Sequence, residues 1–575
     1  MSNYEKLWKS IGIATAGNDD TAAITQHLTA QPQPLHLPNP RELKALRVEA
    51  GMSPEPEPPA KSGADAREKA IQQAVSRLDP AMDQHGGLIL RIREPNGKLT
   101  IIDAQSSAAE ELLALHAYEA TGKSVSTDTI RRHLGVVRAR ARQSAELVRV
   151  RNRTAPLGDG YVIDRGDSTG ACWHVRPARV EVVRNGDTAF RRGQGYGEHP
   201  PAVIPETAYE ALECVRGWLA QAWGLPDDDT TAVALLLVEW QRSDTPQPVL
   251  ELTGGAGAGK TTFAQQLAAL VDPRTAGAAS TRLNREDIAA AVANSYVLYV
   301  DNISTLKADE QDLACLIATG ATISARRLYT QGEVFLLEVL NPLIVTTIIP
   351  ALTRADARTR VLAVQMPNRT GQLSPATLNR EFEARRVELV GALMRLLADG
   401  LERLPQAETA RTYTHRLASF EMLSEAVLSA AAAQAPNPEP YRWGTAGDIF
   451  RRKRKASAEE ASQDVPTVGA VLQLIDEARQ SNPETRVDPP SRKAWLPAKR
   501  YAYVDQQGVL HVGALLPVLL AKVPQTLNGT HGAVSTERAL KLALQLWEHT
   551  LSDIGIRMSV VKTAGGVCVE FQTSI

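Results

Sequence analysis

The stretch VLELTGGAGAGKTTF, residues 249–263, decides the fold class of this chain of 575 residues. It begins as a short apolar strand and continues as a glycine-rich turn that ends in Gly-Lys-Thr. A helical pattern follows, with Phe263, Leu267 and Leu270 on one face. Strand, glycine-rich loop and helix in this order form the phosphate-binding motif known as Walker A. A glycine-rich turn with a chance lysine is the alternative, and both flanking elements argue against it.

The residue types of this loop suit a nucleoside triphosphate. Glycines let the backbone turn tightly, so that consecutive amides face phosphate oxygens, and the helix N-terminus adds a favourable dipole. Lys260 would reach the β- and γ-phosphates and Thr261 would hold Mg²⁺, so ATP and Mg²⁺ are the predicted ligands. The predicted nucleotide-binding residues of the loop are Gly254, Gly255, Ala256, Gly257, Ala258, Gly259, Lys260, Thr261 and Thr262.

A second buried strand is predicted over residues 296–301, YVLYVD, and it ends in an acid. After a Walker A motif, Asp301 is expected to touch Mg²⁺ directly or through water, which makes Thr261 and Asp301 the predicted metal ligands. The next residue is Asn302, where many ATPases place a glutamate that polarises water. Because Asn cannot take a proton, either another carboxylate serves or hydrolysis is slow. Three acids nearby are candidates, or else simply solvated acids on a helix: Asp309, Glu310 and Asp312.

The composition is that of a globular protein, with 43% hydrophobic and 22% charged residues, which excludes a wholly disordered or collagen-like chain. Lys and Arg number 64 against 65 Asp and Glu, so a basic coat over the whole surface is excluded, although local basic patches are not. The 4 cysteines are scattered, which fits a reducing compartment. No apolar run of 18 residues occurs, so we predict a cytoplasmic protein with no membrane partner.

The pattern of elements divides the chain into several domains. Apolar strands alternate with helices over residues 246–370, which predicts a mainly parallel α/β core. The predicted parts are an N-terminal segment with a Pro-rich linker (1–66), an α+β accessory or collar domain (67–202), a helical connector (203–245), the P-loop ATPase core (246–370), a helical subdomain (371–434), a basic linker (435–465) and a winged-helix-like domain (466–575).

Residues 318–350 resemble a region of the superfamily 3 helicases, and more closely the primase-helicase ATPases of poxviruses, phage satellites and mobile elements. The resemblance rests on Thr319-Gly320, Ala325-Arg326, Tyr329 and Phe335, followed by the strand 343–345. It implies an AAA+-type core and a hairpin that points into the central channel of a ring. By the same resemblance Arg326 and Arg327 would touch DNA; they could instead face a neighbouring subunit or be solvated.

Two further positions follow from this resemblance. The family's sensor Asn is absent, and Thr346 or Thr347 stands in its place, where a hydroxyl can still bond the γ-phosphate or the attacking water. The family's Arg that reaches the ATP of the adjacent subunit matches Arg360, with Arg358 and Arg354 as fallback candidates and an intradomain salt bridge as the alternative. Together Lys260, Asp301 and Arg360 are the predicted catalytic residues.

Residues 160–370 also look like uncharacterised ATP-binding proteins of bacterial mobile elements, which carry Asn after the same acid. The familiar pieces are DRGDSTGACWHV, the pair Arg191-Arg192 and VDNIS. This resemblance implies that Asn302 is a feature of the subgroup.

Three regions could meet nucleic acid. Lys123 to Arg153 holds nine basic residues opposed only by Asp128 and Glu146, and either DNA contact or a solvated helix face explains them. A basic run, residues 451–455, sits in the predicted linker. The chain ends as helix, strand, turn and strand, typical of a winged helix that binds DNA or protein. Its candidate recognition residues are Arg538, Lys541, Gln545 and His549.

The sequence thus predicts an α/β P-loop NTPase with an AAA+/superfamily 3-like core, an N-terminal α+β domain and a C-terminal winged-helix-like domain. The leading hypothesis is an ATP-dependent DNA helicase or translocase of a mobile element or phage, working as a homo-oligomer, a hexameric ring, on single-stranded or forked DNA. The second hypothesis is a nucleotide-switched assembly, defence or regulatory protein with weak hydrolysis. A replication or defence protein partner is compatible with either. A small-molecule kinase is disfavoured, because the 319–350 block has no role there.

Overall fold

The computed structural model describes the chain from residue 71 to residue 574, and the structural statements below concern those residues alone. The expected N-terminal segment 1–66 lies outside the described residues. Further positions outside the described residues are 73–74, 76–77, 95, 123, 144–145, 187, 194, 276–281, 327–333, 368–373, 410–412, 414, 439–441, 465, 489, 491–496, 524–535 and 564–565.

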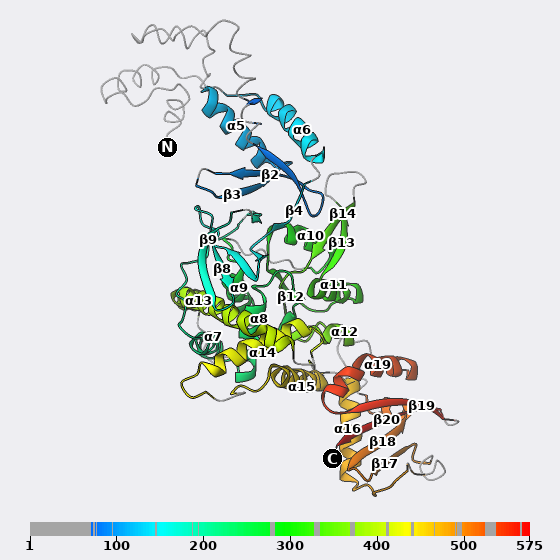
Figure 1. The fold of residues 1–575 in the computed structure, drawn as a ribbon. Coiled ribbons are helices and arrows are strands. Elements are labelled where there is room, and N and C mark those ends of the chain that lie inside the picture. The colour runs from blue at the N-terminus through cyan, green and yellow to red at the C-terminus, as the bar shows by residue number, and fades with distance from the viewer. Residues whose placement is uncertain are drawn as a thin grey trace, which may run out of the picture. The chain divides into compact units, whose positions relative to one another are not determined.

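The first described layer is a four-stranded sheet in the order β3-β2-β1-β4, packed against two helices (Figure 1). The strands β2 and β3 pair antiparallel as a hairpin. The first helix ends at Gly122, whose φ of 64° is left-handed. The elements are β1 (Asp79–Asp83), β2 (Leu88–Arg93), β3 (Leu99–Asp103), α5 (Ser107–Thr121), α6 (Thr127–Gln143) and β4 (Leu147–Val148).

An antiparallel meander follows, in the order β6-β7-β8-β9, beside a short β5–β10 pair. Its elements are β5 (Val150–Arg151), β6 (Thr154–Leu157), β7 (Gly160–Asp164), β8 (Ala171–Arg176), β9 (Arg179–Arg184) and β10 (Ala189–Phe190).

The centre of the fold is a parallel sheet in the order β12-β15-β11-β16, as the alternating pattern predicts. The strand that carries the glycine-rich loop, β11, is therefore an inner strand, and β15 separates it from β12. The elements of this region are β11 (Val249–Thr253), α9 (Lys260–Val271), α10 (Arg285–Asn294), β12 (Leu298–Ile303), α11 (Ala308–Thr319), β15 (Leu343–Thr347), α12 (Ala355–Arg358) and β16 (Val361–Gln365). Between α11 and β15 stands an antiparallel hairpin of β13 (Ala321–Arg326) and β14 (Val334–Val339), packed beside α10.

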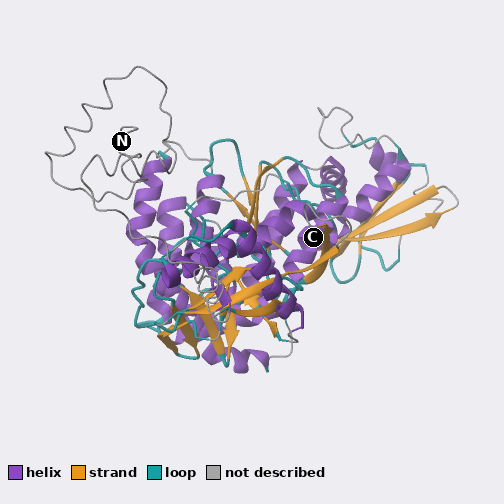
Figure 2. Ribbon diagram, turned by 90° about the horizontal axis from the view of Figure 1, so that it is seen from above, coloured by secondary structure: helices purple, strands orange, loops and turns teal. Residues whose placement is uncertain are grey.

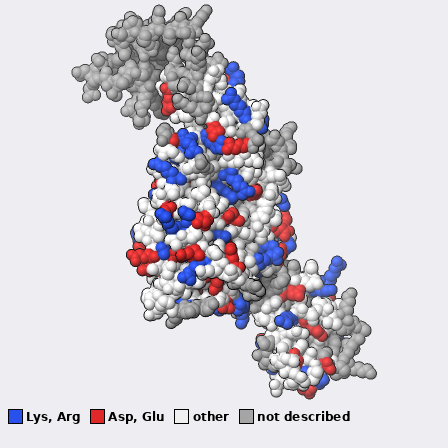
Figure 3. All heavy atoms as spheres, viewed as in Figure 1, with Lys and Arg blue, Asp and Glu red and all other residues white. Residues whose placement is uncertain are grey.

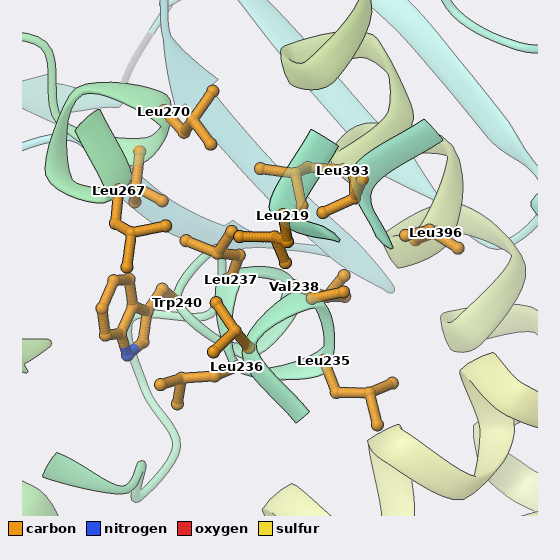
Figure 4. Packing of buried hydrophobic residues seen from close by; sticks show 14 of the residues in the cluster. Leu219, Leu235, Leu236, Leu237, Val238, Trp240, Leu267, Leu270, Leu393 and Leu396 are labelled. Atoms are coloured by element: carbon orange, nitrogen blue, oxygen red, sulfur yellow. The ribbon is translucent and has the colours of Figure 1, made fainter. Parts of the chain in front are cut away.

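Helices cover this sheet and carry the largest core. Leucines of α7, α8, α9 and α13 converge with Trp240 in one apolar cluster (Figure 4). Thr207 opens α7 with a capping box and Gly224 closes it in a left-handed conformation. Every residue of α8 from Asp229 to Glu239 is buried, as expected for a helix surrounded by others. The helices are α7 (Ala208–Trp223), α8 (Asp227–Glu239), α13 (Pro375–Glu408) and α14 (Ala418–Ala433).

The segment expected as a basic linker, 435–465, is largely a helix instead, α15 (Ala446–Asp464). Ala446, Ile449 and Phe450 recur at helical spacing and are buried, so an apolar stripe holds the helix against the core. The Pro-containing stretch before it and the basic run within it favour a linker, and the apolar stripe outweighs them.

The last region has its own core and a four-stranded antiparallel sheet in the order β17-β18-β20-β19. The ending expected from the sequence, a helix followed by two strands, corresponds to α19, β19 and β20, whereas β17 and β18 have no counterpart among the predicted elements. The elements are α16 (Pro466–Gln480), β17 (Arg500–Val504), β18 (Val509–Leu515), α18 (Leu516–Leu520), α19 (Glu537–Asp553), β19 (Arg557–Thr563) and β20 (Gly566–Ser574).

Helices and strands mix throughout the described residues, so the protein is of mixed α/β class (Figure 2). Among the described helices, none combines the length and the apolar character needed to cross a bilayer.

Candidate nucleotide-binding site

The glycine-rich loop leaves the C-terminal end of β11 and enters α9 within six residues, Gly254 to Gly259. Two of its glycines are required by their surroundings. Gly254 has a φ of 143° and Gly259 a φ of 84°, which side-chain-bearing residues rarely adopt. A Cβ on Gly259 would also meet the Trp223 ring at 3.0 Å. The loop therefore turns tightly just before α9, in a conformation that leaves its backbone N–H groups available to a phosphate.

Lys260 and Thr261 are the first residues of α9 and lie at the mouth of this loop. The Lys260 ammonium donates to the carbonyl oxygens of Gly254 at 2.7 Å and Gly255 at 2.9 Å. Partial burial lowers the pKa of Lys260, and the nearby Asp301 carboxylate opposes that shift. Thr262 is half-buried one position further along the helix, and Ala258 is buried in the loop. The described geometry thus brings the predicted loop residues together around one cradle.

The carboxylate of Asp301, on β12, contacts one residue of α9 and one residue of β15. Its carboxylate accepts a hydrogen bond from the Thr261 hydroxyl, with oxygen distances of 3.1 and 3.2 Å. The Thr346 hydroxyl, on β15, lies 2.5 Å from Asp301 Oδ1 and accepts from the Asn302 backbone N–H at 2.8 Å. Tyr299 lies on the same face of β12, and burial together with Asp301 raises the pKa of its phenol.

The two threonines offered for the sensor position differ in their surroundings. Thr346 bonds the carboxylate of Asp301, whereas the hydroxyl of Thr347 donates to the carbonyl of Ile349 at 2.5 Å and is buried. Because β15 lies between β11 and β12, Thr346 is placed beside both the loop and the acid. Of the two, Thr346 is the one that the geometry brings to the site.

Asn302 occupies an unusual backbone position. Its φ is 56°, and the pairing of β12 with β15 shifts register between Val300 and Ile303. Asparagine tolerates the left-handed region better than most side-chain-bearing residues. At this bulge the Asn302 side chain is exposed and lies next to Asp301 in the chain. The left-handed backbone conformation at the bulge favours asparagine over most other side-chain-bearing residues.

The donor set fits a magnesium ion that is also bound by phosphate oxygens. Thr261 offers a hydroxyl and Asp301 a carboxylate on adjacent atoms, and hard oxygen ligands of this kind suit Mg²⁺. Among the described residues, no three His, Cys, Asp or Glu side chains gather into a metal cage. An ion held here would therefore depend on a bound nucleotide for several of its ligands.

Two of the three acids that follow Asn302 in the sequence, Glu310 and Asp312, have structural partners of their own. Glu310 accepts from the Lys307 backbone N–H at 2.7 Å and so caps α11, and Asp312 pairs with Arg354 at 2.8 Å. A further carboxylate, Glu251, is not among the predicted site residues. It is wholly buried in β11, accepts from the N–H groups of Ala351 and Leu352, and burial raises its pKa. A charged residue inside an apolar strand is the signal that could have found it.

Arg360 lies at the N-terminal ends of the parallel strands, whereas the glycine-rich loop of the same chain lies at their C-terminal ends. The Arg360 carbonyl accepts from the N–H of Val249, at the start of β11, whereas the loop leaves the other end of that strand. Five residues of strand separate these ends by about 15 Å. Its guanidinium donates to the carbonyl of Asp356 at 2.6 Å. Of the fallback candidates, Arg358 lies 3.9 Å from Glu251 and Arg354 pairs with Asp312.

A cavity of about 730 Å³ borders the loop at Gly254 and Gly255. Such a volume is within the usual range for small-molecule sites. Its walls are the acidic start of α8, the segment after β16 and the basic run of α15. Arg452 pairs with Asp228 at 2.7 Å, and Lys453 pairs with Asp229. The basic run, expected to be solvated or to touch DNA, thus contributes two cations to the wall of this cavity.

The basic segment of the accessory region divides into paired and exposed residues. Arg131 pairs with Glu110, Arg138 donates to the Ala104 carbonyl, and Arg153 is buried against Asp272 at 3.0 Å. Figure 3 shows Lys and Arg side chains gathered over α6. Arg131 is exposed although it is paired, and Arg132, Arg140, Arg142 and Arg149 are exposed as well. Lys123 lies outside the described residues.

Of the two predicted DNA-contacting residues, one lies among the described residues, at the end of β13 in the β13–β14 hairpin. Arg326 is the last residue of β13, opposite Val334, and Arg327 lies outside the described residues. In α19, Arg538 is exposed, Lys541 is half-buried and Gln545 is exposed, so one face of that helix stays polar.

Comparisons with known proteins give one family and several distant structures. Residues 223–442 match the family described as actinomycete integrative conjugative element replication protein, over somewhat more than a third of the chain. No curated protein matches the chain.

Among solved structures, an active helicase of SCCmec type IV, Cch, is 13% identical, with 81% of this chain and 89% of that chain covered and a TM-score of 0.38. The NrS-1 C-terminal region is 12% identical over 88% and 98%, with a TM-score of 0.34. A full-length MCM homologue from Methanopyrus kandleri is 14% identical over 64% and 89%, with a TM-score of 0.26. TM-scores below 0.5 do not establish a shared fold.

Proposed function

We propose that this protein is an ATP-dependent DNA helicase or translocase that serves the replication of a mobile genetic element. The observation that carries the proposal is the grouping of Lys260, Thr261 and Asp301 around one loop, with Thr346 bonded to the acid. The match of residues 223–442 to a replication-protein family supports the choice of DNA replication as the process.

The proposed chemistry is transfer of the γ-phosphoryl group to water. In this reaction the protein contributes positioning and charge stabilisation rather than a covalent intermediate. Lys260 would leave the carbonyls of Gly254 and Gly255 and bind the β- and γ-phosphates, while the loop amides hold the phosphate chain. Thr261 and Asp301 would hold Mg²⁺, which supplies charge neutralisation when bound. Thr346 would keep the Asp301 carboxylate aimed at that ion.

We further propose that ATP sites lie between subunits of an AAA+-type ring, a hexamer in the family that the chain resembles. The position of Arg360 supports this arrangement, because it stands at the sheet edge opposite its own loop and cannot serve its own site. A neighbouring copy could present that edge to the loop. The hairpin that carries Arg326 would then contact the strand of DNA, with Arg327 as the second contact that the resemblance implies.

The test is steady-state ATP hydrolysis with and without single-stranded DNA, measured for the parent protein, Lys260→Ala and Arg360→Ala. We expect DNA to stimulate hydrolysis and both variants to lose it. Mixing the two inactive variants provides the sharper test, because a shared site regains activity where one subunit's Lys260 meets another's Arg360. Hydrolysis by the parent protein that is indifferent to DNA would contradict the motor. Activity of Arg360→Ala at the parent level would contradict the shared site.

One observation favours a second candidate, a nucleotide-switched regulatory protein. Asn302 replaces the glutamate that polarises water in many ATPases, and the acids Glu310 and Asp312 are already engaged elsewhere. Tight ATP binding with negligible turnover, unaffected by DNA, would favour this candidate over the motor.

A further inference from the structure

A second cavity, of about 200 Å³, lies away from the glycine-rich loop, where six regions of the chain meet. Its walls come from the β1–β2 turn, the segment that follows α6, the residue after β10, the segment after α8, the end of α10 and the base of the β13–β14 hairpin. The hairpin base is tied to this wall directly, since the Glu338 backbone N–H donates to His85 at 3.4 Å. We call it the arginine cavity, after Arg149, Arg151 and Arg191, which line it.

Two of these three arginines lack an ion-pair partner among the described residues. Arg191 pairs with Asp83 at 2.7 Å, whereas the Arg151 guanidinium donates to the carbonyl of Ser243 at 3.3 Å. Arg149 is exposed at the rim. Burial and the neighbouring charge of Arg149 lower the pKa of Arg151, although Asp244 and Glu338 offset part of that effect. A half-buried guanidinium without a carboxylate bonded to it is costly unless an anion binds there.

A separate observation also points to a ligand. The Ser243 hydroxyl is buried in the wall of the cavity and makes no hydrogen bond to any described residue. Buried hydroxyls are nearly always bonded, so this one could donate to a ligand in the cavity only after the Ser243 side chain rotates toward it. Two guanidinium groups and a hydroxyl donor together match the oxygens of a phosphate group.

Acidic side chains in the same wall limit what can bind. Asp244 accepts a hydrogen bond from the Tyr161 hydroxyl at 2.8 Å, and Glu338 lies on the exposed edge of β14. A large polyanion could not fill the cavity without approaching them. A single phosphate linkage needs far less space than the cavity offers. Arg149 could contact it at the rim and the half-buried Arg151 could contact it further inside.

We propose that the arginine cavity binds one phosphate of a single-stranded DNA backbone, held by Arg149 and Arg151 and hydrogen-bonded by Ser243. The proposal rests on the proposed DNA function and adds a second contact, at the base of the hairpin rather than at its end. A DNA strand bound there would contact both the accessory region and the β13–β14 hairpin. A movement of either part would then displace the DNA relative to the other part. The alternative source of the same chemistry is the phosphate of a free nucleotide.

The experiment measures binding of a fluorescein-labelled oligothymidylate by anisotropy at several NaCl concentrations. Arg149→Ala and Arg151→Gln should each weaken binding about tenfold at 100 mM salt, as expected when a charge-assisted hydrogen bond is removed. The slope of log K against log salt should fall by about 0.7 for each phosphate that the variant no longer neutralises. Arg149→Lys should keep most of the slope. Arg416→Ala, an exposed arginine outside both the cavity and the basic segment 123–153, is the matched control and should change little.

Binding of a fluorescent ATP analogue and the thermal melting midpoint show whether each variant is folded. If the parent protein binds DNA and the two cavity variants match it in affinity and slope, this inference fails while the proposed function stands. If the parent protein does not bind DNA, both fail. A free nucleotide is tested in the Lys260→Ala background: residual analogue binding that disappears with Arg149→Ala would assign the cavity to a nucleotide and overturn the DNA proposal.

Discussion

The Thr346 hydroxyl lies 2.5 Å from the Asp301 carboxylate, and the same hydroxyl accepts the backbone N–H of Asn302. One side chain on β15 therefore fixes both the direction of the acid and the bulge that follows it. Strand order makes this contact possible, since β15 runs between β11 and β12. The threonine that replaces the expected sensor asparagine acts here on the acid itself.

We expect Thr346→Val, which removes the hydroxyl and keeps the shape, to lower ATP turnover about tenfold, as is typical for groups that orient a metal ligand. The Mg²⁺ concentration for half-maximal hydrolysis should rise, because a freely rotating Asp301 holds the ion less well. Thr346→Ser restores the hydroxyl and should recover most of the activity. A magnesium titration of the three proteins checks this, and an unchanged half-maximal concentration in Thr346→Val would contradict it.

Asn302 is expected to be retained for its backbone conformation. Asn302→Val should lower the free energy of unfolding by about 1–2 kcal/mol, because a β-branched residue is strained at a φ of 56°. Asn302→Gly should melt close to the parent protein and keep its hydrolysis rate. Thermal melting and ATP turnover of both variants test the idea. Loss of activity in a well-folded Asn302→Gly protein would show instead that the amide takes part in the reaction.

The sequence predicts those parts of the site that are local. The strand, loop and helix from residue 249 to residue 271 follow from neighbouring residues, and so does an acid, Asp301, in the predicted strand 296–301. The observed strand β12 instead begins at Leu298 and runs two residues beyond that acid, to Ile303. The mainly parallel core predicted over residues 246–370 is likewise confirmed. These features depend on periodicity and glycine placement, which short segments carry by themselves.

What the sequence does not predict depends on partners far apart in the chain. The run 451–455 favours a linker because the local sequence shows its adjacent basic residues but not their partners. Two of those partners, Asp228 and Asp229, stand more than two hundred residues earlier. Arg153 belongs to the basic segment in the sequence, yet it is buried against Asp272. The arginine cavity combines segments from residue 84 to residue 341, and no spacing rule joins them. Charge alone does not distinguish solvated arginines from paired ones.

Gly259 is expected to tolerate no side chain. Gly259→Ala forces a Cβ into the Trp223 ring and into a left-handed φ, so it should destabilise the protein by about 1–2 kcal/mol and abolish binding of the ATP analogue. Gly217→Ala is the matched control. It lies within α7 with open space at its Cβ position and should raise stability by about 0.5–1 kcal/mol. Analogue binding by Gly259→Ala at the parent level would refute this account of the loop.

His415 should make the protein sensitive to acid. Burial lowers its pKa to about 4, with Arg454 contributing to the shift, and its Nδ1 accepts from the Leu417 N–H at 3.0 Å. The unfolded chain binds a proton near pH 6.5, so stability falls as the pH drops from about 6.5 towards 4, at about 1.4 kcal/mol per pH unit for this one group. Melting midpoints of the parent protein and His415→Gln between pH 7 and pH 4.5 test this. The variant should show the flatter profile, and parallel curves would exclude His415 as the cause.

The pair Lys453–Asp229 is expected to hold α15 against α8 beside the glycine-rich loop. Both side chains are largely buried, and burial raises the pKa of Asp229 although Lys453 opposes the shift. Lys453→Met should lower the free energy of unfolding by about 3–5 kcal/mol, because it leaves a buried carboxylate unpaired, whereas adding Asp229→Asn should recover much of that stability.

Arg451→Ala, an exposed residue of the same basic run, is the control and should stay within about 0.5 kcal/mol of the parent. A double variant no more stable than Lys453→Met would show that the ion pair does not couple the two helices. If the pair also shapes the cavity next to Gly254, the single variant should lose affinity for the ATP analogue and the double variant should regain part of it.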